Sequence, residues 1–205
     1  MRSSSMFDAP GAEVDALVAA YPLAQTVSAS AEGLHATALP MLLERDAPDG
    51  GDWLVGHMAR ANPHVALLRL RPRALFVFMG PHAYVSPSWL DDRSQAPTWN
   101  FCTVHFEADV AFQDDPASAL AAVQALTRHM ERQRARAWQV EEMGARRDRL
   151  LEAIVPFRAR IVREQVKFKL GQNERPDVRR QIIDALDAQG DAALARRMRD
   201  AWPER

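Results

Sequence analysis

The sequence contains very little cysteine. Cys102 is the only cysteine among its 205 residues, which excludes an internal disulfide and a cysteine-based zinc site. It occupies an apolar position of an expected strand, which favours a small core residue over a reactive thiol. The N-terminal residues do not show the basic stretch followed by an apolar segment that is typical of a signal peptide. No apolar run approaches the roughly 20 residues of a membrane span. We therefore expect a cytoplasmic protein without membrane contact.

Glycine is also scarce, and its placement argues against the common nucleotide-binding folds. The nine glycines never fall as G-x-G-x-x-G, and no Walker-type phosphate loop is present. The motif of serine hydrolases, G-x-S-x-G, and that of zinc metalloproteases, H-E-x-x-H, are absent as well. Catalytic residues therefore stay unassigned, and no metal site is expected.

The chain lacks a strong net charge, although its charges are unevenly distributed. The net charge is −1, whereas the segment from Arg128 to Arg180 holds fifteen Lys or Arg against eight Asp or Glu. This segment is either a set of solvated faces or a patch for an anionic ligand or nucleic acid. DNA is thus a possible partner, but the overall charge does not support it.

The hydrophobic pattern predicts an α+β barrel. Apolar residues at helical spacing indicate helices at 13–21, 116–136, 177–188 and 191–202, and Gly190 is expected to end the third of these as a C-terminal cap. Alternating or continuous apolar residues indicate strands at 23–29, 34–43, 53–58, 73–80, 102–112, 157–161 and 166–170, with a bulge between Val162 and Gln165. Six to seven mostly antiparallel strands, most of them joined as hairpins and arranged in a Greek-key-like order with peripheral helices, fit a barrel. We expect this domain over residues 1–170, including the inserted helix, and a packed C-terminal helical pair over 171–205.

The stretch GHMARANPH, Gly56–His64, predicts a strand that leads into a capped helix. Asn62 suits the cap and Pro63 the first turn. Free N–H groups at such a helix start suit a phosphate or carboxylate, with His57 and Arg60 close in sequence. Alternatively, Asn62 is only a cap and His57 a strand histidine with a local hydrogen bond.

A second candidate segment follows the most apolar strand, Arg73–Gly80, whose successive apolar residues predict cover on both faces. In GPHAYVSPSWL, Gly80–Leu90, the prolines predict that the chain leaves the barrel wall at once. Its serines could bind a polar ligand and its aromatic rings a flat one. Alternatively, the aromatic rings plug the barrel end.

Two further segments carry similar chemistry. APTWNF, Ala96–Phe101, again combines a hydroxyl, an indole and an amide at a strand start. Lys167 and Lys169 share one strand face before GQNERP, where they either meet a phosphate or protect a solvated edge. Together these segments suggest a planar ligand with polar edges.

In this order, the motifs GHMARANP, FMGPHAYVSPSWL, PTWNF, VHF and FKLGQN closely resemble those of the PaiB-like family of FMN-binding negative transcriptional regulators. The resemblance runs from about Pro22 to the C-terminal helices. It implies a split barrel like that of pyridoxamine-phosphate-oxidase-related flavoproteins, and a homodimer with the FMN site at the subunit interface. The residues that it assigns to cofactor binding are His57, Met58, Asn62, Ser86, Ser88, Trp89, Thr98, Trp99, Asn100, Lys169, Gln172 and Asn173.

The resemblance leaves several functions open. One is an FMN-binding homodimeric regulator, and another is a flavin-dependent oxidoreductase or haem-binding protein of the same fold. Haem would need an axial histidine, for which His57 and His82 are the obvious candidates. The chain departs from the family pattern at Ala38, His64 and Leu90, which keeps a cofactor-free interaction module as a third alternative.

Overall fold

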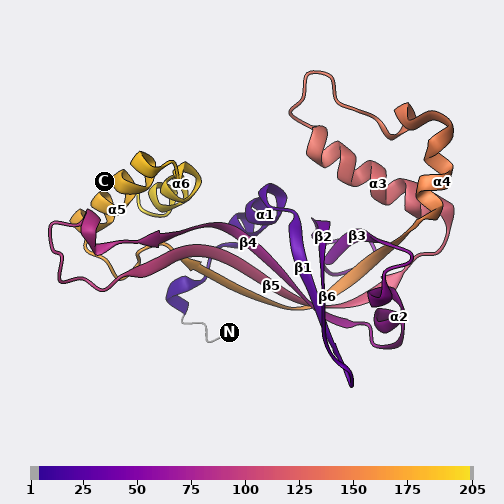
Figure 1. The fold of residues 1–205 in the computed structure, drawn as a ribbon, viewed down its shortest axis with the longest axis horizontal. Coiled ribbons are helices and arrows are strands. Elements are labelled where there is room, and N and C mark those ends of the chain that lie inside the picture. Colours follow the sequence, from indigo (N-terminus) through magenta and orange to yellow (C-terminus); the bar gives the residue numbers. More distant parts are fainter. Residues whose placement is uncertain (1–4, 204–205) are drawn as a thin grey trace. The chain divides into compact units, whose positions relative to one another are not determined.

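The computed structural model describes residues 5–203, and within them six strands form a closed barrel in the order β1-β2-β3-β6-β5-β4. The strands are β1 (Leu23–Ser30), β2 (Gly33–Glu44), β3 (Trp53–Ala59), β4 (Arg73–Val85), β5 (Thr98–Phe112) and β6 (Ile154–Lys169). The helices are η1 (Ser5–Phe7), α1 (Gly11–Ala20), α2 (Pro63–Leu70), η2 (Pro87–Trp89), α3 (Pro116–Glu131), η3 (Val140–Arg146), α4 (Arg147–Glu152), α5 (Pro176–Gln189) and α6 (Ala192–Ala201). Figure 1 shows these elements in sequence colours. The predicted barrel with peripheral helices is confirmed.

The described residues divide into two compact units. Unit 1 comprises the described residues within Met1–Leu17, Met79–Val104 and Gln165–Arg205. Unit 2 comprises Val18–Phe78 and His105–Glu164. The strands β4, β5 and β6 therefore contribute residues to both units. The expected domain boundary near residue 170 stays a prediction.

Antiparallel pairing builds the barrel within unit 2. Strands β1 and β2 form the predicted hairpin, with Thr26 opposite Thr37, and β3 pairs with β6, with His57 opposite Pro156. Pairing of β1 with β4, from Leu75 to Phe78, closes the barrel. Its largest fully buried side chains are those of Met41, Leu54, Met58, Leu68, Phe76, Phe78, Phe106 and Phe157. Strand β3, which begins the GHMARANP motif, contributes Leu54 and Met58 to this apolar core.

Strand β4 differs from the sequence prediction in two respects. Its apolar run is not covered on both faces, because Ala74, Phe76 and Phe78 are buried whereas Met79 is 48% exposed. The chain also does not leave the strand at Pro81, since β4 continues to Val85. Pairing with β1 stops at Phe78, so the missing N–H of Pro81 removes no hydrogen bond to that neighbour.

Helix boundaries follow local signals more closely. Asn62 caps α2 as predicted, with its Oδ1 accepting a hydrogen bond from the His64 backbone N–H at 2.9 Å. Helix α3 ends at Glu131 rather than Arg136, because residues 131–136 offer no apolar side chain larger than that of Ala135 to bury. Within the described residues, no helix combines the length and apolar composition that a membrane crossing needs.

Unit 1 contains the C-terminal helical pair. Helix α5 buries Val178, Ile182 and Leu186, which lie one turn apart, and α6 buries Leu194 and Met198. Gly190 ends α5 in the left-handed region at φ 90°, which confirms the predicted glycine cap. The two helices lie side by side at the yellow end of the ribbon in Figure 1.

Candidate functional site

In unit 2, the GHMARANP residues lie on β3 and at the start of α2. Met58 is fully buried and so belongs to the barrel core. His57 is half-buried, its Nδ1 atom is buried without a hydrogen-bond partner among the described residues, and burial lowers its pKa. The unpaired nitrogen is a polar group that a ligand atom could satisfy.

Asn62 is already engaged by the protein itself. Its Oδ1 accepts from the N–H of His64, and its Nδ2 donates to Thr37 Oγ1 at 3.4 Å. The side chain therefore caps α2 and ties it to β2. This geometry fits the interpretation of Asn62 as a structural cap. A ligand could still bind the backbone N–H groups at the start of α2 that the Asn62 side chain does not occupy.

His64 is a buried polar residue whose position the sequence did not predict. Its Nε2 lies 2.6 Å from Ser28 Oγ and its Nδ1 lies 2.9 Å from Thr37 Oγ1. Burial, and secondarily the nearby His35, lowers the pKa of His64. His64 stands where the family often carries a glutamine, so the departure from the pattern was the available signal. The imidazole joins α2 to β1 and β2.

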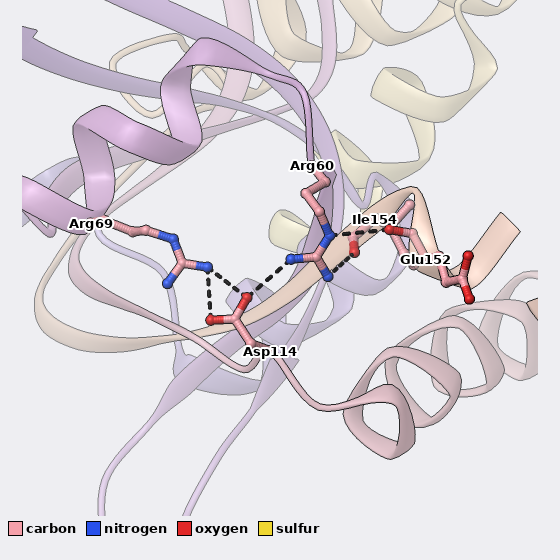
Figure 2. Close-up of polar contacts among 5 residues, drawn as sticks. All are labelled: Arg60, Arg69, Asp114, Glu152 and Ile154. Atoms are coloured by element: carbon pink, nitrogen blue, oxygen red, sulfur yellow. Dashed lines mark hydrogen bonds and ion pairs between the residues drawn. The ribbon is translucent and has the colours of Figure 1, made fainter. Parts of the chain in front are cut away.

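Arg60 is held by unit 2 rather than presented to a ligand (Figure 2). Its guanidinium donates to Asp114 Oδ1 at 3.1 Å and to the backbone oxygens of Glu152 and Ile154 at 3.1 and 2.9 Å. Arg69 approaches the same carboxylate from the opposite side, at 2.7 Å. The two arginines hold the pKa of Asp114 below its usual value. Arg60 thus anchors the β3–α2 connection to the chain around β6.

In unit 1, the serines of the GPHAYVSPSWL stretch form a local turn. Ser86 caps η2 and lies 2.7 Å from the hydroxyl of Ser88. Trp89 is half-buried, and Leu90, where the family carries an aromatic residue, is buried. The hydroxyl pair is exposed, so it is available to a polar ligand.

The PTWNF motif begins β5 and presents a large aromatic surface. Trp99 is 51% exposed and lies beside His82 and Tyr84 of β4, with ring centroids 6.1 and 6.2 Å apart. Asn100, on the adjacent position, is 2% exposed and its Nδ2 lies 3.5 Å from Met198 Sδ of α6. Trp99 is therefore the exposed aromatic side chain of this motif, and Asn100 is an interior residue.

The lysines of β6 lie beside the PTWNF motif. Lys169 Nζ donates to Thr98 Oγ1, and Lys167 Nζ lies 5.7 Å from the centroid of the Phe101 ring. Both lysines are half-buried, so they are not fully solvated edge residues. Unit 1 thereby brings together a cation, a hydroxyl and exposed aromatic rings.

The GQN residues that follow β6 differ from one another. Gln172 accepts from the Leu170 N–H at 2.8 Å and donates to the Phe168 backbone oxygen, so it stabilises the turn after β6. Asn173 is exposed. Only Asn173 of this pair presents its side chain to solvent.

Sequence comparison identifies the family. The family described as "Putative FMN-binding domain" matches residues 2–163. The chain belongs to this family. A curated relative, Protease synthase and sporulation protein PAI 2 of Bacillus subtilis, is 29% identical over 154 residues, which cover 74% of this chain and 72% of that protein. The match confirms the PaiB-like resemblance, and the FKLGQN motif lies beyond the matched family segment.

Solved structures share the fold. A flavocytochrome from Azotobacter vinelandii superimposes with a TM-score of 0.59 at 15% identity, over 81% of this chain and 70% of that one. A FAD and heme binding protein from Mycobacterium smegmatis gives 0.55 at 17% identity, over 80% and 73%. These similarities confirm the predicted split barrel.

Proposed function

We propose that this protein binds FMN, with the aromatic and cationic residues of unit 1 contributing to the site. The observation that carries the proposal is the exposed Trp99 of β5, which lies beside Tyr84 of β4 and follows Thr98, the partner of Lys169 of β6. A flavin needs flat apolar contact for its ring and positive charge for its phosphate. The family membership and the split-barrel fold support the same cofactor.

The fit of a flavin to the residues of unit 1 also rests on uncovered aromatic surface, because Trp99 leaves half of its surface exposed. Trp99 would contact the ring, Lys169 would attract the phosphate, and the exposed Ser86 and Ser88 would bind polar atoms. Bound FMN would supply one- or two-electron redox chemistry.

The homodimer with FMN at the subunit interface is part of this proposal. Exposed large aromatic residues, such as Trp99 and Tyr84, are enriched where proteins meet. Light scattering of the protein as it elutes from a size-exclusion column gives its molar mass and so distinguishes a dimer from a monomer. A monomer in the presence of saturating FMN would contradict the interface site.

FMN binding is tested by the visible spectrum of the purified protein and by titration of FMN fluorescence. We expect Trp99→Ala to weaken binding about tenfold or more, because one aromatic stacking partner is worth about 1–3 kcal/mol for a planar base. Trp138→Ala is the matched control, since Trp138 is a 38% exposed tryptophan of unit 2. Absence of flavin binding by the unmodified protein would overturn the proposal, and a Soret band would favour haem.

We further propose that the protein acts as a negative transcriptional regulator, as its PaiB-like motifs suggest. The excess of basic residues between Arg128 and Arg180 supports contact with nucleic acid. A gel-shift experiment with fragments of the source genome at low salt tests this role. Free migration of every fragment would argue against direct DNA binding, because phosphate contacts are strongest at low ionic strength.

A further inference from the structure

A groove of about 980 Å³ lies at the α5–α6 pair of unit 1, next to Leu170 and Gly171 of the FKLGQN motif. Its charged lining consists of Arg179, Arg180 and Arg199 with a single carboxylate, Asp184. Ile183 and Trp202 add apolar surface. The groove thus combines an excess of guanidinium groups with an apolar wall, the composition of a site for an organic anion.

Arg179 is fixed in place at this groove. Its guanidinium carbon lies 4.3 Å from the centroid of the Trp202 ring. The Trp202 indole is itself held, because its Nε1 donates to the Leu170 backbone oxygen at 3.1 Å. The Arg179 side-chain carbons also pack against Gly171, where an added Cβ would stand 3.4 Å from Arg179 Cγ. The ring contact and the glycine contact together orient the guanidinium before any ligand arrives.

This oriented guanidinium has no carboxylate partner among residues 5–203. Arg199 of the same groove pairs with Asp187, whereas the interaction that the structure gives the Arg179 guanidinium is the contact with Trp202. A half-buried cation that is stacked but unpaired retains its N–H donors for an external acceptor. Stacking on one face leaves those in-plane donors directed outward.

We propose that the α5–α6 groove binds the phosphate group of a small organic phosphate. The planar Arg179 fork can bond two phosphate oxygens in a bidentate pair. A phosphate also carries more negative charge than a carboxylate, which suits a lining of three guanidinium groups and one carboxylate. The apolar wall of Ile183 and Trp202 accommodates the organic part of the ligand.

Isothermal titration calorimetry with AMP, adenosine and inorganic phosphate tests the proposal. We expect AMP to bind more tightly than inorganic phosphate, and adenosine not to bind, because the phosphate is the recognised group. Arg179→Ala should weaken AMP binding about tenfold or more, since a charge-assisted bidentate contact is lost. Arg179→Lys keeps the charge but loses the planar fork, so it should also weaken binding.

Two controls make the result decisive. Arg196→Ala removes the same charge from an exposed position of α6 outside the groove lining and should leave AMP binding unchanged. Trp99→Ala should likewise leave it unchanged, which separates the groove from the proposed flavin site. Equal binding of AMP and adenosine, unaltered binding by Arg179→Ala in a variant with native circular dichroism, or no saturable binding at millimolar AMP would each overturn the proposal.

Discussion

The imidazole of His64 lies 2.6 Å from the hydroxyl of Ser28, a buried contact that joins helix α2 to strand β1. Its other nitrogen meets Thr37 of β2 at 2.9 Å. In a neutral imidazole one nitrogen donates and the other accepts, and a hydroxyl can take either role. The two hydroxyls therefore satisfy a ring that is only 3% exposed.

We expect Ser28→Ala to lower the free energy of unfolding by about 1–3 kcal/mol, because one nitrogen of the buried His64 ring loses its partner. Urea unfolding followed by circular dichroism measures the change. Ser30→Ala is the matched control, since Ser30 pairs with the less buried His35 at 3.1 Å. Loss of this hydrogen bond should lower the free energy of unfolding by about 0.5 kcal/mol or less. Equal losses from the two variants would show that burial of the His64 pair adds nothing.

The pH dependence of stability follows from the same residue. Burial lowers the pKa of His64, and also that of His57, below 6.5 in the folded protein. The unfolded chain therefore binds protons more readily in the window below 6.5, and stability falls as the pH drops through it. The stability that the neutral, buried His64 and His57 contribute is fully present above the pKa that these histidines have in the unfolded chain.

Urea midpoints measured between about pH 8 and about pH 5 test this direction. In the variant His64→Gln the fall towards acid pH should be shallower than in the unmodified protein, since one buried imidazole no longer resists protonation. An unchanged slope would assign the acid sensitivity to other groups. His82→Gln serves as a control at an exposed histidine of β4.

The sequence predicted those features that depend on neighbouring residues. The Asn62 cap, the start of α2 at Pro63 and the Gly190 helix end are local, and the structure confirms them. The apolar position of Cys102 in β5 also predicted its burial, which is complete. Local backbone preferences and strand periodicity carry this information without knowledge of the fold.

The missed features depend on residues that are distant in the chain. Ser28 and His64 are 36 positions apart, and no periodic pattern links a strand hydroxyl to a histidine in a later helix. Arg60 was considered as a ligand group because of its neighbours, whereas Asp114 and two backbone oxygens hold it. Pro81 indicated a loop because the sequence does not reveal that pairing with β1 has already ended.

Gly56 of the GHMARANP motif is predicted to tolerate no side chain. A Cβ there would lie 2.9 Å from Met41 Cγ, 3.1 Å from Phe157 Cζ and 3.3 Å from the Pro40 backbone oxygen. We expect Gly56→Ala to lower the free energy of unfolding by about 1–3 kcal/mol, because a packed interior cannot absorb the extra methyl group without strain. Gly11→Ala is the control, since its added Cβ meets nothing within 4 Å. A neutral Gly56→Ala in urea unfolding would contradict the close packing of β2, β3 and β6.

Cys102 is expected to be chemically silent in the folded protein. Its side chain is fully buried, and that burial raises the pKa of the thiol to about 11. Since the thiolate is the reactive form, native protein mixed with DTNB near neutral pH should release almost no thionitrobenzoate, whereas protein in guanidinium chloride should release one equivalent, as its single cysteine requires. Cys102→Ala supplies the blank, and free glutathione supplies the rate of an accessible thiol. Reaction of the native protein at the rate of glutathione would show that β5 opens at this position, because no other thiol exists to account for the colour.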